Sequence, residues 1–117
     1  MKTYKLASEV IEKNQAAIVI FTRGEFFEFD SAGNGSTGHW KASAASVEKM
    51  DKVIVCLRGA KVRDNRIFLG NFTGSKPSSL VPGRLVIRFS ALQEVGTTDM
   101  TWTEFSGCQG PVRYILG

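Results

Sequence analysis

Trp40 is the residue whose type and position are best suited to binding a ligand. It follows a Gly-, Ser- and Thr-rich segment, residues 31–38, and precedes a serine that can cap a helix. A tryptophan in such a place can face a cleft, where its flat π surface stacks on a nucleobase. The alternative is that the ring closes the end of a β-barrel as a core residue. The sequence leaves both possibilities open.

A second aromatic and polar stretch lies near the end of the chain, in the Gly-, Ser- and Thr-rich segment 96–110. If the two segments meet, their tryptophans form two walls of a cage for a flipped or modified base, and stacking contributes about 1–3 kcal/mol per base. The ligand-binding residues expected from both stretches are Trp40, Lys41, Ser43, Trp102, Glu104 and Phe105. The alternative is a glycine-rich loop anchored by hydrophobic side chains, and this alternative fits Phe105 best.

The charge balance is mildly basic, with 15 Lys and Arg against 11 Asp and Glu and a net charge of +4. Such a surplus permits a polyanionic partner without requiring one. Four basic residues surround one connection and form a candidate phosphate-contact patch: Arg58, Lys61, Arg63 and Arg66. A solvated loop is the alternative, and Asp64 dilutes the patch.

Catalytic and metal-binding patterns are scarce. His39 is the only histidine, and Cys56 and Cys108 form no CxxC or Cys/His cluster, so we expect no metal site. Neither a GxSxG nucleophile motif nor a GxxxxGK[ST] phosphate loop occurs. We therefore expect no catalytic residue and no cofactor. If the protein were an enzyme, Glu104 with His39 or Lys41 would be its acid–base set.

The elements that must position these residues are mostly strands. Apolar runs and period-2 alternation predict strands at Ala16–Thr22, Val53–Arg58, Arg66–Thr73 and Arg84–Phe89, with a closing strand at Val112–Leu116 and a pairing segment at Glu25–Asp30. Short helices are expected over Leu6–Asn14 and from the Ser43 cap through Met50, and loops over 31–38 and 74–83. The chain is thus expected to be one α+β, mostly β domain over residues 1–117, an antiparallel or mixed barrel with two short helices.

The order of these elements resembles the PUA-like superfamily, which includes the PUA, EVE, ASCH and YTH domains. The resemblance rests on the aromatic segment His39–Ser43, the stretch Met50–Leu57, the strand Ile67–Gly74 and the later strand Arg84–Phe89. Met50 stands where the family pattern has glycine. The resemblance covers the chain from about residue 16 onward. It implies a curved or closed β-barrel that binds RNA or a modified base in a pocket beside the aromatic loop.

The expected function is therefore a non-catalytic binding module for nucleic acid or a modified nucleobase, with base stacking on loop tryptophans. A small protein-interaction or inhibitor module is the first alternative, and an ASCH-like enzyme acting on a nucleotide-like substrate is the second. Residues 1–15 carry charges throughout, and the apolar run Ala16–Phe21 is too short to span a bilayer. We expect a cytoplasmic protein with no membrane partner.

Overall fold

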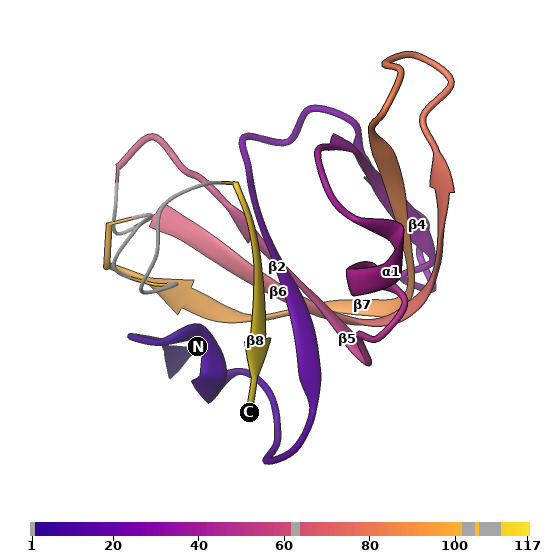
Figure 1. The fold of residues 1–117 in the computed structure, drawn as a ribbon. Coiled ribbons are helices and arrows are strands. Elements are labelled where there is room, and N and C mark those ends of the chain that lie inside the picture. The colour runs from indigo at the N-terminus through magenta and orange to yellow at the C-terminus, as the bar shows by residue number, and fades with distance from the viewer. Residues whose placement is uncertain (1, 62–63, 102–104, 106–110) are drawn as a thin grey trace.

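Eight strands form one mixed sheet in the part of the chain that the computed structural model describes, residues 2–61, 64–101, 105 and 111–117 (Figure 1). The elements are β1 (Lys2–Thr3), the 3-10 turn η1 (Ala7–Glu9), β2 (Ala16–Thr22), β3 (Phe27–Phe29), β4 (Gly35–Trp40), α1 (Ala44–Val47), β5 (Lys52–Leu57), β6 (Asn65–Pro77), β7 (Leu85–Thr98) and β8 (Val112–Leu116). The strand order is β3-β4-β7-β6-β5-β2-β8, and β1 pairs with β7. Over the described residues the sheet is not closed into a barrel.

Most strand pairs are antiparallel, but β2 and β5 run parallel, with Thr22 opposite Leu57. The crossover between them carries β3, β4 and α1. The long strands β6 and β7 form a hairpin whose pairing contains three register shifts, and such irregularities bend and twist a sheet. Figure 1 shows the resulting curl, with α1 lying against one side of the sheet.

Two hydrophobic cores lie on opposite sides of β2, because successive side chains of a strand point to opposite faces. Val19 and Phe21 belong to the first core, which η1 and Phe105 cover. Ile18 and Ile20 belong to the second core, which α1 covers with Val47. Strand β7 also contributes to the second core, although two strands separate it from β2 in the sheet. The sheet therefore curls around the second core.

The predicted mostly β character is confirmed, and so are several strand positions. The strands Ala16–Thr22 and Val112–Leu116 occur as predicted, and β5 lies within one residue of its predicted bounds. Strands β6 and β7 extend beyond their predicted ends, to Pro77 and Thr98. Pairing along the hairpin carries these strands through Gly74 and Gly96, where the sequence pattern had indicated loops.

The predicted loop over residues 31–38 is wrong in its second half, because β4 begins at Gly35 and pairs with β3 and β7. The glycines serve close packing here. A β-carbon on Gly35 would overlap the carbonyl oxygen of Glu28, and one on Gly33, which has a φ of +83°, would overlap the backbone of Leu92. A glycine-rich strand is thus what allows these backbones to approach one another.

The two predicted helices are shorter than expected. The segment Leu6–Asn14 contains only the turn η1, where Glu9 accepts hydrogen bonds from the backbone N–H groups of Lys5 and Leu6 and Asn14 has a φ of +70°. The second helix is the single turn α1. Within the described ranges, no helix is long and apolar enough to cross a membrane.

Candidate ligand pocket beside Trp40

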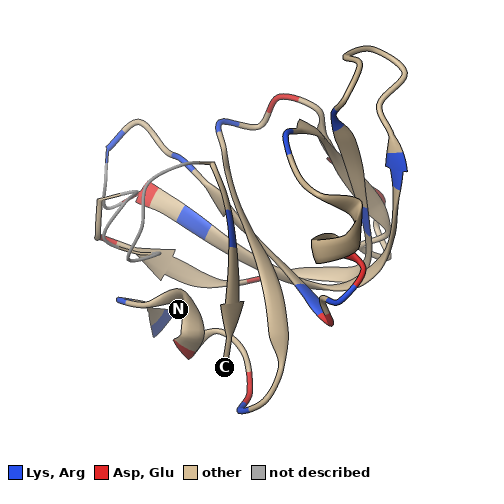
Figure 2. Ribbon diagram, in the orientation of Figure 1, with Lys and Arg blue, Asp and Glu red and all other residues tan. Residues whose placement is uncertain are grey.

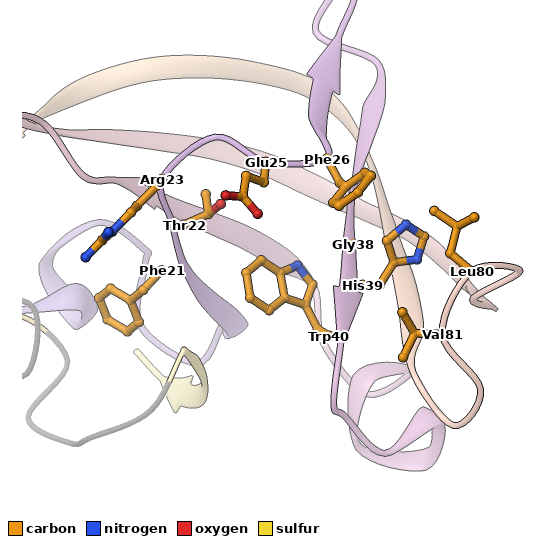
Figure 3. Close-up of a pocket in the computed structure, with 10 residues that line it drawn as sticks. All are labelled: Phe21, Thr22, Arg23, Glu25, Phe26, Gly38, His39, Trp40, Leu80 and Val81. Atoms are coloured by element: carbon orange, nitrogen blue, oxygen red, sulfur yellow. The ribbon is translucent and has the colours of Figure 1, made fainter.

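A pocket of about 360 Å³ lies at the end of β4 (Figure 3). Three segments supply its walls: the connection after β2, the end of β4 and the tip of the β6–β7 hairpin. The lining residues are Phe21, Thr22, Arg23, Glu25, Phe26, Gly38, His39, Trp40, Leu80 and Val81. The volume lies at the lower end of the range for small-molecule sites, so the pocket suits one base-sized group.

The indole of Trp40 is fixed at its edge. Its Nε1–H donates a hydrogen bond to Oγ1 of Thr37 at 3.1 Å, and Thr37 is fully buried. The ring is only partly buried and packs against the second core. Figure 3 shows the indole at the centre of the pocket, with the carboxylate of Glu25 directed toward it. An aromatic ring held this way is a preorganised stacking surface.

Phe26 and His39 also line the pocket and contact each other. Their rings meet edge to face, with centroids 4.8 Å apart and an interplanar angle of 79°. Phe26 has a φ of +55°, a conformation that bulky residues rarely adopt, and 56% of its surface is exposed. Such strain persists only where the surroundings hold it, and it tends to cluster at functional sites.

Ser78 fixes both His39 and the hairpin tip. Its Oγ accepts hydrogen bonds from the backbone N–H groups of Leu80 and Val81, at 3.1 and 2.9 Å. The same Oγ lies 2.6 Å from Nδ1 of His39. Because the hydroxyl oxygen already accepts these two hydrogen bonds, its proton is available to donate to Nδ1 of the His39 tautomer that carries its proton on Nε2. Leu80 and Val81 are thereby placed at the rim.

The pocket combines aromatic faces and apolar walls with a few polar groups. The Glu25 carboxylate can accept a hydrogen bond from an amino or ring N–H group, and the His39 imidazole can donate one. Among the described residues, no group of three or more His, Cys, Asp or Glu side chains could hold a metal ion. The arrangement is suited to holding a flat heteroaromatic group rather than to activating a nucleophile, since the nearby Ser78 hydroxyl is fully engaged.

Of the expected ligand-binding residues that the structure describes, Trp40 lines the pocket and the others do not. Trp40 lines the pocket, whereas Lys41 and Ser43 are exposed and do not line it, because the chain turns into α1 after β4. Ser43 occupies the N-cap of α1, but its side chain makes no capping hydrogen bond. Phe105 is fully buried in the first core and packs edge-on against Phe21, with ring centroids 6.4 Å apart. Phe105 therefore lies away from the pocket, on the other side of β2.

Trp102 and Glu104 lie outside the described residues, and so does Arg63 of the candidate phosphate patch. Arg66 of that patch forms two hydrogen bonds with Glu94, Nε to Oε2 at 3.0 Å and Nη2 to Oε1 at 2.8 Å. This pairing raises the pKa of Arg66 and lowers that of Glu94. Its guanidinium is thus already bound to a carboxylate. Lys61 is exposed, and Arg58 borders a separate hollow.

Sequence reasoning missed the two hydrophobic residues at the hairpin tip and the role of Phe26. Leu80 and Val81 are 63% and 39% exposed, and they lie between Pro77 and Pro82 in a segment that was expected to be a polar loop. Two adjacent aliphatic residues in such a loop are the signal that could have identified this rim. The contribution of Phe26 depends on its positive φ, which no local pattern indicates.

Comparisons of the chain with protein-family models, with curated proteins and with solved structures each find no match. The function is therefore inferred from the geometry of the pocket and its surroundings.

Proposed function

We propose that this protein is a binding module for nucleic acid and that the pocket beside Trp40 holds one base, modified or unmodified. The proposal rests on one observation: an indole fixed by Thr37 lines a base-sized space that the Phe26–His39 ring pair also lines. Stacking of a base on such a ring contributes about 1–3 kcal/mol. The curled β-sheet is compatible with a divergent PUA-like fold, which is the fold we propose.

Two further features support the proposal. Glu25 and His39 give the pocket a hydrogen-bond acceptor and a donor for the edge of a base. Such hydrogen bonds distinguish one base from another, which stacking alone does not. The net charge of +4 favours encounter with a polyanion. We place the protein in the cytoplasm, in keeping with the free thiol of the buried Cys56.

The test measures binding of labelled oligonucleotides by fluorescence anisotropy, with modified and unmodified bases. Trp40→Ala removes the stacking surface and should weaken binding by about 1–3 kcal/mol. Trp40→Phe keeps an aromatic face and should retain most of the affinity. Because Trp40 also packs against the second core, both variants are assayed well below their melting temperatures. Unchanged affinity in folded Trp40→Ala would overturn the proposal.

Tryptophan fluorescence locates the ligand independently. In a Trp102→Phe background, Trp40 is the only tryptophan, so quenching by a bound base reports on the pocket. Quenching that persists when Trp40 is the sole emitter supports stacking. Binding without quenching places the ligand elsewhere.

A protein-interaction module is the second candidate, because Phe26, Leu80 and Val81 expose adjacent apolar surface at the rim. Under this alternative, wild-type protein would not bind oligonucleotides of any composition. Leu80→Ser would then weaken association with a protein partner. Under the nucleic-acid proposal it should weaken oligonucleotide binding instead, because Leu80 lines the pocket.

A further inference from the structure

The pocket beside Trp40 belongs to a series of four adjoining hollows. Arg23 lines both the pocket and a hollow of about 390 Å³ that Arg58 borders. On the other side, Phe26 and His39 line both the pocket and a smaller hollow of about 200 Å³, which reaches Lys76. Lys76 in turn lines a hollow of about 670 Å³ together with Arg88. Through these shared residues the four hollows adjoin in series, and this series is called the path below. A fifth hollow of about 320 Å³, lined by Glu28 and Asp30 among others, adjoins its second end.

Both ends of this path are basic. At the first end, the parallel register of β2 and β5 places Arg23 and Arg58 side by side, and the backbone N–H of Arg58 donates to the carbonyl of Thr22 at 2.9 Å. The other residues lining this hollow are Gly59 and Ala60. An anion at this end could contact two arginines that lie at neighbouring strand ends.

The second end combines two cations with hydroxyl groups from three neighbouring strands. Lys76 comes from β6 and Arg88 from β7, and Ser36 of β4 lies opposite Arg88 in the ladder. The remaining lining residues are Asn34, Gly35, Thr73, Phe89 and Ser90. None of the described residues that line this hollow is acidic. Cations combined with hydroxyl and amide groups are a typical environment for phosphate oxygens.

Acidic residues line the middle of the path, and Asp30 with Glu28 lines the fifth hollow beside its Lys76–Arg88 end. Glu25 lines the pocket and Glu28 lines the small hollow between the pocket and Lys76. Charge is otherwise spread over much of the fold, as Figure 2 shows, so the order of charges along the path carries the argument rather than their number.

We propose that the ligand is a single strand several nucleotides long, with one base in the pocket and its flanking phosphates over the Arg23–Arg58 and Lys76–Arg88 ends. This inference rests on the proposed function and specifies its ligand class. A free base would contact neither basic end, because it carries no phosphate. A mononucleotide would contact at most one of the two ends. A duplex cannot place a stacked base into the pocket unless that base is flipped out.

The first experiment compares ligands of increasing length, from a nucleoside monophosphate to a hexanucleotide, in both RNA and DNA. Affinity should rise at least tenfold between the monophosphate and the hexanucleotide, because only the longer strand reaches both basic ends. Equal affinity across lengths would overturn this inference and leave the base-binding function standing. The RNA and DNA arms show whether the 2′-hydroxyl contributes.

The second experiment measures how the affinity for the hexanucleotide depends on salt. Single-strand contacts contribute about 0.7 to the slope of log K against log[salt] per phosphate neutralised. Arg23→Gln with Arg58→Gln should lower the slope by about 1.4, and so should Lys76→Gln with Arg88→Gln. The matched control is Lys49→Gln with Arg66→Gln, which removes the same charge from residues outside the four hollows. It should leave the slope unchanged.

The outcomes separate the two proposals. If either double variant at the ends behaves like the control while Trp40→Ala still weakens binding, the continuous path is wrong and the base pocket stands. If wild-type protein binds none of the strands at low salt, the proposed function itself fails. Equal loss in all three double variants would mean non-specific charge attraction and would also overturn the path.

Discussion

Oγ of Ser78 lies 2.6 Å from Nδ1 of His39, and this contact joins the β6–β7 hairpin to the end of β4. A second contact joins the same two segments, because Nη1 of Arg84 donates a hydrogen bond to the carbonyl oxygen of His39 at 3.3 Å. The serine thus helps to hold the rim of the pocket, carried by Leu80 and Val81.

Ser78→Ala should therefore lower the free energy of unfolding by about 1 kcal/mol, the usual net contribution of a hydrogen bond. It should also weaken oligonucleotide binding, because the hairpin tip loses one of its two hydrogen-bonded contacts with His39. The matched control is Ser79→Ala, which changes the exposed neighbouring serine. Denaturant unfolding and anisotropy titrations check both effects, and indistinguishable results for the two variants would contradict the role of Ser78.

Thr37→Val tests whether the indole must be fixed. Valine preserves the shape of the buried side chain but removes the oxygen that accepts the Trp40 N–H. We expect a loss of about 1 kcal/mol in stability and weaker base binding, with the fold retained. In a Trp102→Phe background, the fluorescence anisotropy of Trp40 should fall as the ring gains freedom. An unchanged anisotropy would show that core packing alone holds the ring.

Gly35→Ala tests the glycine-rich strand. The added methyl group would overlap the carbonyl of Glu28 and separate β3 from β4, so we expect a loss of several kcal/mol or failure to fold. Gly83→Ala is the control, because Gly83 has a φ of +79° but a β-carbon added there would have no atom within 4 Å. It should cost only about 1–2 kcal/mol of backbone strain. Circular dichroism melts of the two variants make the comparison, and similar melting temperatures would mean that β3 can shift without penalty.

Burial raises the pKa of the Cys56 thiol to about 12, from an ordinary value of 9.0. The folded protein therefore keeps this proton over a pH range in which the unfolded chain loses it. The contribution of the thiol to stability is fully present below pH 9 and declines as the pH rises from 9 toward 12. We expect the stability difference between wild type and Cys56→Ala to narrow between pH 8 and pH 10, as measured by urea unfolding. A constant difference would contradict the raised pKa.

The same burial makes Cys56 slow to alkylate. In a Cys108→Ser background, iodoacetamide at pH 8.5 should modify the folded protein only as fast as it opens, and the unfolded protein rapidly. Rapid modification of the folded protein would show that the thiol is accessible.

Two of the strands that were predicted well, β2 and β5, are buried on both faces. Ala16–Thr22 is a continuous run of β-branched, alanine and aromatic residues because it contributes to two cores, and its pattern needs no tertiary information to be recognised. The second half of β7 was missed because its residues 90–98 mix polar and apolar types, and its pairing with β6 and β1 is decided by long-range partners.

The candidate site was predictable only at Trp40. The sequence indicates a tryptophan beside a helix cap, but the fold decides which segments face it. Residues 102–105 were expected beside Trp40. Of these the structure describes Phe105, which fills the first core, whereas the hairpin tip and Phe26 line the pocket. Spatial neighbours that lie 40 residues apart, such as Trp40 and Leu80, follow from sheet order, which local periodicity does not specify.

The alternation of side chains along β2 has a thermodynamic consequence for the pocket. Val19 and Phe21 belong to one core while Ile18 and Ile20 belong to the other, so the two cores share a single backbone segment. Neither core can melt while the other keeps β2 in place, and the described fold should unfold in one cooperative step. A cavity made beside Phe105 would then depopulate the binding-competent state of the pocket, although Phe105 itself does not line it. A substitution that destabilises the first core should therefore lower the apparent affinity of the pocket beside Trp40.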